Sequence, residues 1–197
     1  MNIQEQAEKL GLNPEEAKTL LHKVKHLDQE GVDFEEADAS LHLYAKRLFK
    51  KDTPAFEVLS LSSQVFHGHS NHHCQTTVKV KTASKEVLSV AEADGPVEAL
   101  DLAFRRALEK DFPAIKDMIL NNYKVRILDP QRAAAATTRV WIEAKYQDQT
   151  WCTVGCSRDI LAASSQALQE SFDYFITEVL QLNHSTERKS TNDNQAA

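Results

Sequence analysis

The sequence predicts an α+β fold in which an N-terminal helical segment is followed by two tandem βββα units. Apolar residues recur at helical spacing before Pro54 and alternate with polar residues after it, which indicates a change from helices to strands. Three strands and a long helix then follow in the same order twice. A shift of 64 residues (154 − 90) aligns the two copies and superimposes Val90 on Val154, Ala99 on Ala163, Ala103 on Ala167 and Phe104 on Leu168.

The predicted organisation comprises a helical linker at 1–53, a domain at 54–183 with repeats 56–118 and 120–183, and a disordered tail at 184–197. A single βββα unit cannot bury its apolar sheet face, so two units should pack together, and a second chain should join them. We therefore expect a homodimer. The tail is polar throughout and lacks the apolar periodicity needed to dock on a core.

Two helices are predicted in the linker. Asn13, Pro14 and the acids that follow are typical of a helix start, and Gly31 is typical of a helix end. A second helix is expected directly after Asp33. The apolar faces are Ala17, Leu20, Leu21, Val24 and Leu27 in the first helix, and Phe34, Ala37, Leu41, Tyr44, Ala45 and Leu48 in the second. This pair is too small to be stable by itself.

Alternating and β-branched residues mark the strands of both units. Strands are expected from Phe56 to Phe66, at 76–82 and at 86–91, and again at 123–128, 138–143 and 150–154. Asp94-Gly95-Pro96 begins the first long helix, and the second begins near Asp159. The inward faces of these helices contain Val97, Leu100, Phe104, Ala107, Leu108 and Ile115, and then Ile160, Leu161, Ala167, Leu168, Phe172, Phe175 and Val179.

Composition restricts the function. The chain has 197 residues and a net charge of −6, and its Lys and Arg residues are interspersed with acids, which disfavours nucleic acid or an anionic membrane as a partner. No apolar run approaches the ~20 residues of a membrane helix. Three cysteines and the absence of a signal peptide indicate reduced thiols in a cytoplasmic protein. Only five glycines are present, without GxGxxG, P-loop or GxSxG motifs, so we expect neither catalysis nor a cofactor.

Several ordered runs resemble one known family. The run from Asn122 to Asp129, the segment from Ala135 to Glu143, and the run from Trp151 to Gly155 that continues to Tyr174 resemble the C-terminal, LeuA-type allosteric and dimerisation domain of citramalate synthases. The segment from Asp94 to Asp101 resembles a helix start shared with 2-isopropylmalate synthases. Leu10-Gly11-Leu12 and the segment from Glu36 to Ser40 resemble the linker that precedes this domain.

The resemblance implies a regulatory domain that forms homodimers and binds isoleucine, as in citramalate synthases, or leucine, as in 2-isopropylmalate synthases. In these acyltransferases a metal-dependent TIM barrel precedes the domain and condenses acetyl-CoA with a 2-oxo acid such as pyruvate. A barrel of ~250 residues has no counterpart in this sequence. We expect feedback sensing whose output is a barrel in cis or in trans. A structural dimerisation module without a ligand is the alternative.

The start of the first long helix is one half of the predicted effector site. Unpaired N–H groups at the start of a helix suit a ligand carboxylate, and Gly95, Pro96 and Val97 form that start. Asp94 would accept the ligand ammonium group. The alternative is that Asp94 is a plain N-cap.

The other half is an apolar slot, which the resemblance assigns to Leu120, Tyr123, Ile127, Ala136 and Thr138. Tyr123 and Ile127 are four residues apart and should share one strand face. The alternative is that these residues are ordinary sheet core. The resemblance is weakest from Gln131 to Ala136, where the family often has a glycine and this chain has an alanine run.

A His-rich loop allows a second class of function. His67, His69, His72 and His73 lie close to Cys74 between the first two predicted strands. His and Cys are common zinc ligands, but this spacing matches no known structural zinc site, so these residues are weak candidates and no metal is predicted. Cys152 and Cys156 should face one side of their strand as small apolar residues rather than nucleophiles.

Overall fold

The computed structural model describes residues 3–49, 53–68 and 72–181, so His69 and the predicted tail at 184–197 lie outside the described residues. The chain is α+β, as predicted. The helices are α1 (Ile3–Lys9), α2 (Pro14–Gln29), α3 (Asp38–Leu48), α4 (Pro96–Leu108) and α5 (Ile160–Tyr174). The strands are β1 (Phe56–His67), β2 (His72–Thr82), β3 (Glu86–Ala93), β4 (Ile119–Ile127), β5 (Thr138–Tyr146) and β6 (Gln149–Ser157). Two short 3₁₀ helices are η1 (Pro113–Asp117) and η2 (Pro130–Ala135), and η3 (Phe175–Val179) is a π-helical turn that continues α5. None of the described helices has the length and apolar character needed to cross a bilayer.

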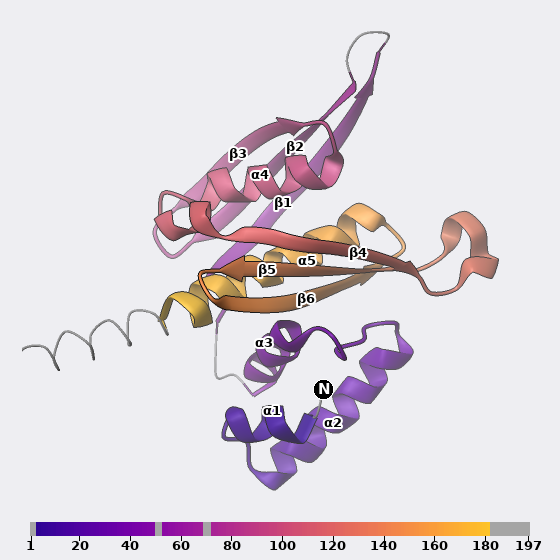
Figure 1. Ribbon diagram of the computed structural model, residues 1–197, viewed down its shortest axis with the longest axis vertical. Coiled ribbons are helices and arrows are strands. Elements are labelled where there is room, and N and C mark those ends of the chain that lie inside the picture. The colour runs from indigo at the N-terminus through magenta and orange to yellow at the C-terminus, as the bar shows by residue number, and fades with distance from the viewer. Residues whose placement is uncertain (1–2, 50–52, 69–71, 182–197) are drawn as a thin grey trace, which may run out of the picture.

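The two predicted βββα units are present. Strands β1-β2-β3 form one antiparallel sheet and β4-β5-β6 form the other. Along the long axis of the molecule the first unit, the second unit and the three N-terminal helices follow one another (Figure 1). The aligned alanines Ala99, Ala103, Ala163 and Ala167 are all fully buried, which supports the internal repeat.

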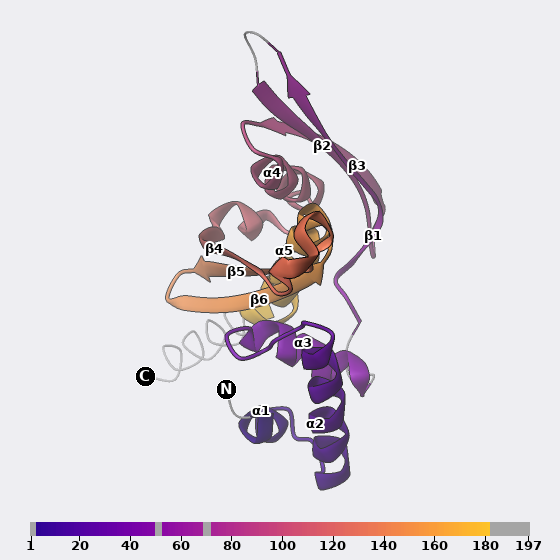
Figure 2. The same cartoon turned by 90° about the vertical axis from the view of Figure 1, so that its right-hand side faces the viewer.

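The helices of the two units join both sheets in one core. Helix α4 packs on β2 and β3, and α5 packs on β5 and β6. Figure 2 shows α4 beside the first sheet and α5 beside the second. The Phe104 ring lies 6.2 Å from that of Phe56 and 5.9 Å from that of Phe172, so an aromatic row passes from the first sheet through α4 to α5. This shared core fixes the position of α4 relative to β4, where the candidate site lies.

Residues 3–49 of the N-terminal segment contain three helices rather than the two predicted. Gly31 ends α2 with φ +100°, as expected, but the next helix begins at Asp38 and not directly after Asp33. Arg139 on β5 holds the connection: its Nε donates to the Gly31 carbonyl at 2.5 Å, and its Nη1 lies 3.0 Å from Asp33. Phe34 and Ala37 are buried as predicted, but they precede the helix.

Helix α3 covers the outer edge of the second sheet. The Cys152 N–H donates to Asp38 Oδ1 at 3.1 Å, and the Val154 N–H donates to Ser40 Oγ at 2.9 Å. Trp141 and Val154 belong to a second core shared with α2 and α3. The small helical segment is therefore stabilised by β5 and β6, and β6 has no free edge at these two residues.

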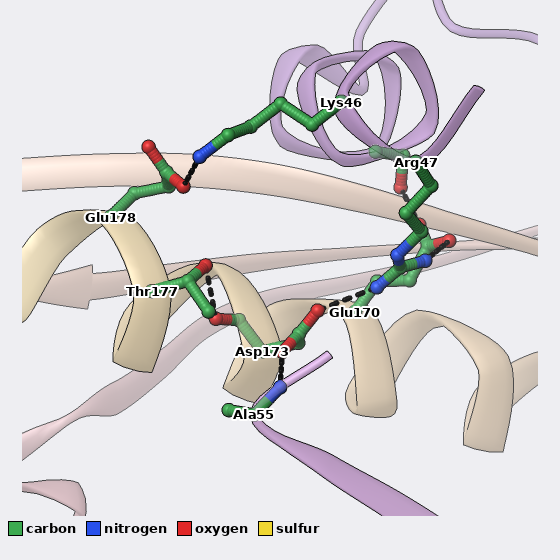
Figure 3. Close-up of polar contacts among 8 residues, drawn as sticks. Lys46, Arg47, Ala55, Glu170, Asp173, Thr177 and Glu178 are labelled. Atoms are coloured by element: carbon green, nitrogen blue, oxygen red, sulfur yellow. Dashed lines mark hydrogen bonds and ion pairs between the residues drawn. The ribbon is translucent and has the colours of Figure 1, made fainter. Parts of the chain in front are cut away.

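An ionic seam joins α3 to the C-terminal helix (Figure 3). Lys46 lies 2.5 Å from Glu178, and Arg47 lies 2.6 Å from Asp173. Asp173 also accepts the Ala55 N–H at 2.6 Å, immediately before β1. This seam connects the helical segment and the start of the first unit to the second unit.

Candidate functional site

A cavity of about 290 Å³ lies between the first turns of α4 and the start of β4. Three of the nine predicted effector residues, Val97, Leu120 and Tyr123, line it. The full lining is Val97, Glu98, Asp101, Leu120, Asn121, Asn122, Tyr123 and Ile142. A cavity of this size suits a small molecule such as an amino acid better than a nucleotide.

Gly95 and Pro96, at the start of α4, precede the residues that line this cavity and do not line it themselves. Gly95 is the N-cap (φ −120°, ψ 151°) and Pro96 is the first helical residue. The alternative that Asp94 is the N-cap is therefore wrong, because Asp94 precedes the cap and its side chain is exposed. Within the described part of the chain no side chain caps this helix start, so its first N–H groups have no side-chain acceptor there.

The remaining predicted residues lie at the other end of the second sheet. Ile127 pairs with Thr138 across β4 and β5, and Ala136 is buried just after η2. Ile127 is four residues from Tyr123, or about 13 Å along a strand. Within one protomer the structure does not bring these three residues into the cavity.

Strand β4 does not form ordinary core in the protomer. Tyr123 is 41% exposed and Ile127 is 55% exposed, which contradicts the core alternative for these two residues. They share one strand face, as predicted, because their partners Ile142 and Thr138 are four residues apart on β5. The Tyr123 hydroxyl lies 2.9 Å from Ser164 Oγ on α5, a contact that fixes the ring at the cavity wall.

Asp101 is a cavity residue that the sequence analysis missed. Its Oδ2 accepts from Arg105 Nε at 2.7 Å, whereas its Oδ1 is buried and has no hydrogen-bond partner among the described residues. Burial raises the pKa of this carboxyl, although the adjacent Arg105 opposes the shift. Asp101 is four residues after Val97 on the same helical face, which is the signal that could have identified it.

The cavity therefore combines an apolar wall with acceptors for a cation. Val97, Leu120 and Ile142 supply the aliphatic surface, and Asp101 and Glu98 supply carboxylates on α4. Such a cavity can hold an aliphatic side chain against the wall while an ammonium group approaches the acids.

The predicted thiol pair is remote from this cavity. Cys152 and Cys156 share one side of β6, as their spacing predicted, and this side faces the helical segment. Cys152 packs against the second core, and Cys156 Sγ lies 4.0 Å from the Glu30 carbonyl. Burial raises the pKa of Cys152 to about 12 and also raises that of Cys156. Neither thiol has the lowered pKa of a nucleophile.

Comparison with known proteins identifies the family. Residues 35–176 match the model of the LeuA allosteric (dimerisation) domain. The chain is 38% identical to a (R)-citramalate synthase of Synechocystis sp. over 88% of its length, and 37% identical to that of Geobacter sulfurreducens over 79%. The matched segments cover 33% and 30% of the lengths of those two proteins. A more distant match, at 30% identity, joins 55% of this chain to 19% of a 2-isopropylmalate synthase of Shewanella frigidimarina. The chain belongs to the LeuA allosteric (dimerisation) domain family.

Proposed function

We propose that this chain is the amino-acid-sensing and dimerisation domain of a citramalate synthase-like enzyme, with isoleucine as its effector. The observation that carries the proposal is the cavity between α4 and β4, which has an aliphatic wall and a buried, incompletely paired carboxylate. We propose isoleucine rather than leucine as the effector because the relatives at 37–38% identity are citramalate synthases. Leucine sensing, as part of a 2-isopropylmalate synthase, is the second candidate.

In this proposal Asp101, rather than Asp94, accepts the ammonium group. Asp101 lines the cavity, whereas Asp94 is exposed and lies outside it. The effector carboxylate would lie toward the start of α4, where the helix dipole and the N–H groups of Val97 and Glu98 favour an anion, since Pro96 has no N–H. Val97, Leu120 and Tyr123 would contact the side chain.

A second copy would unite the two halves of the predicted site. If β4 pairs with β4 of a second copy in antiparallel fashion about Val125, Tyr123 of one copy lies opposite Ile127 of the other. Ile127 and Thr138 of one protomer would then approach the cavity of its neighbour. Because the complete site would exist only in the dimer, effector binding would stabilise dimerisation by linkage.

The output of the sensor would be a catalytic TIM barrel in cis or in trans. The chain spans about a third of the length of its citramalate synthase relatives. An effector that binds one arrangement of the dimer more tightly shifts the population toward that arrangement, and the attached or associated barrel would respond to the shift. The location would be the cytoplasm.

Calorimetric titration with isoleucine, leucine and valine tests the proposal. The parent should bind isoleucine most tightly. Asp101→Asn should weaken binding by about 100-fold, because an ammonium group loses its charged partner in a partly buried site, whereas Asp94→Asn should bind like the parent. If only Asp94→Asn loses affinity, the ammonium acceptor is wrong. If the parent gives no heat with any of the three amino acids, the structural dimerisation module is the better interpretation.

A further inference from the structure

The β1–β2 hairpin extends past the third strand of its sheet. Strand β3 ends at Ala93, opposite Cys74, so the cross-strand pairs Phe66–His73 and His67–His72 belong to a two-stranded ribbon (Figure 1). Neighbouring pairs face opposite sides of a ribbon. On one side the Phe66 and His73 rings stack at 4.8 Å with an interplanar angle of 12°. His67 and His72 are therefore together on the other side.

The two imidazoles converge on a common point. His67 Nδ1 and His72 Nδ1 are 3.1 Å apart, and the ring centroids are 4.8 Å apart. Zinc binds imidazole nitrogen at about 2.0–2.1 Å, which separates two nitrogens in a tetrahedral site by about 3.3 Å. A metal ion between the rings would thus require a movement of only a few tenths of an ångström.

We propose that His67 and His72 form a chelating site for a divalent transition metal at the tip of this hairpin. Both side chains are exposed, so ions have access from solvent. In the metal-free pair one Nδ1–H donates to the other Nδ1. On metal binding this proton moves to Nε2 of the same ring, and both Nδ1 lone pairs then face the ion. Water supplies the remaining ligands.

Among the described side chains, the two imidazoles are the protein ligands. Cys74 faces the same side of the ribbon, but it is fully buried, with its Sγ 3.8 Å from the Asp94 carbonyl. In the described part of the chain no group of three or more His, Cys, Asp or Glu residues is arranged around a metal. A two-nitrogen site with open positions should follow the usual order for imidazole ligands, with Cu²⁺ bound more tightly than Ni²⁺ or Zn²⁺.

The bound ion would cross-link the two strands beyond the support of β3. Such a link fixes the register of the ribbon and suppresses its opening, since only the folded hairpin presents both ligands together. The proposal rests on the geometry of the His pair alone and does not depend on amino-acid sensing.

Titration of tag-free protein with NiCl₂ and with ZnCl₂, followed by calorimetry, tests the site. The parent should bind one ion per chain. His67→Ala, His67→Gln and His72→Ala should each weaken binding by at least about tenfold, because the second nitrogen of a chelate binds intramolecularly. His73→Ala is the matched control, since its ring faces the opposite side of the same ribbon, and it should bind like the parent.

Three results would overturn the proposal. The first is the absence of saturable binding by the parent up to about 1 mM metal. The second is unchanged affinity in both His67 variants and in His72→Ala. The third is equal loss of affinity in His73→Ala, which would assign binding to a diffuse His cluster. Circular dichroism of every variant establishes that the fold is intact, which is expected for side chains at a hairpin tip.

Discussion

Ala133 is a residue whose backbone conformation suits another amino acid. It has φ +49° and ψ −120° inside the η2 turn, a region in which a Cβ is strained and glycine is not. Ala133 belongs to the alanine run at which the resemblance to the family is weakest. The turn therefore has a glycine-type backbone conformation with an alanine in it.

We expect Ala133→Gly to stabilise the protein by about 1 kcal/mol, because release of the strain exceeds the entropy that glycine adds to the unfolded chain. Thermal unfolding checks this. Ala134→Gly, one residue along in the same exposed turn and without a positive φ, is the control and should be neutral or slightly destabilising. A lower melting temperature for Ala133→Gly than for the parent would show that the turn relaxes without strain.

Glu170 gives the seam between α3 and α5 a dependence on pH. Its Oε2 accepts from Ser40 Oγ, and Arg47 lies 3.5 Å from Oε1. Desolvation in the seam raises the pKa of Glu170 from 4.5 to about 7, and the hydrogen bond and Arg47 only partly oppose it. Because the folded state holds this proton more tightly, the stability associated with it is present below about pH 4.5 and is lost as the pH rises through about 7.

Glu170→Gln should therefore remove this pH dependence. The amide oxygen can still accept from Ser40 but carries no charge to desolvate. The variant should match the parent near pH 5 and exceed its stability by about 2 kcal/mol near pH 8. Denaturant unfolding at both pH values measures the difference, and histidine titration cancels because it is common to both proteins. Parallel profiles would mean that Glu170 is ionised across this range.

At the scale of elements, the two βββα units differ in how closely each helix approaches its sheet. A Cβ added at Gly155 on β6 would lie 1.9 Å from the Ala163 carbonyl oxygen and 3.0 Å from the Ala167 nitrogen. The 64-residue shift aligns Gly155 with Ala91 (155 − 91), which is buried under α4 with its methyl group in place. Helix α5 thus approaches its sheet at a point where only glycine fits.

Gly155→Ala should push α5 from the sheet and cost about 3 kcal/mol or more, since a backbone atom cannot yield as a flexible side chain does. The melting temperature and the soluble yield measure the effect. Gly95→Ala is the control, because a Cβ there meets nothing within 4 Å and should cost about 1 kcal/mol or less. Similar losses in the two variants would mean that α5 adjusts its position freely.

The elements that the sequence predicted correctly are those that local pattern determines. Strand alternation, the helix starts at Pro96 and Asp159, and the 64-residue repeat all depend on residues close in the chain. The predicted start of α3, directly after Asp33, was wrong because Arg139, more than 100 residues away in the chain, holds the connection that follows Gly31. For the same reason only part of the candidate cavity could be predicted: Val97, Leu120 and Tyr123 line it, whereas Asp101 stands out only because the fold buries it next to β4.

At the scale of the whole molecule, the sheet edges differ in how well they are protected from pairing. The outer edge of β6 is covered by α3, and at the edge of β3 the Val90 carbonyl accepts a hydrogen bond from Arg106 Nη1 at 2.8 Å. Strand β1 carries a bulge between Val58 and Ser60, which disfavours pairing. In β4 the irregularity lies at Leu120–Asn122, and the strand that follows is regular and carries exposed Tyr123, Val125 and Ile127.

This edge is where we expect the homodimer to form, so Val125→Lys should yield a monomer. A charge at the centre of the antiparallel pair would meet its own copy across the two-fold axis, and like charges directly opposite are destabilising. The chain itself should remain folded, because Val125 is 40% exposed in the protomer. Leu88→Lys on the outer face of the first sheet is the matched control: Leu88 is 66% exposed, and this variant should stay dimeric. Sedimentation at micromolar concentration distinguishes the two, and a monomer from Leu88→Lys with a dimer from Val125→Lys would place the interface on the first sheet.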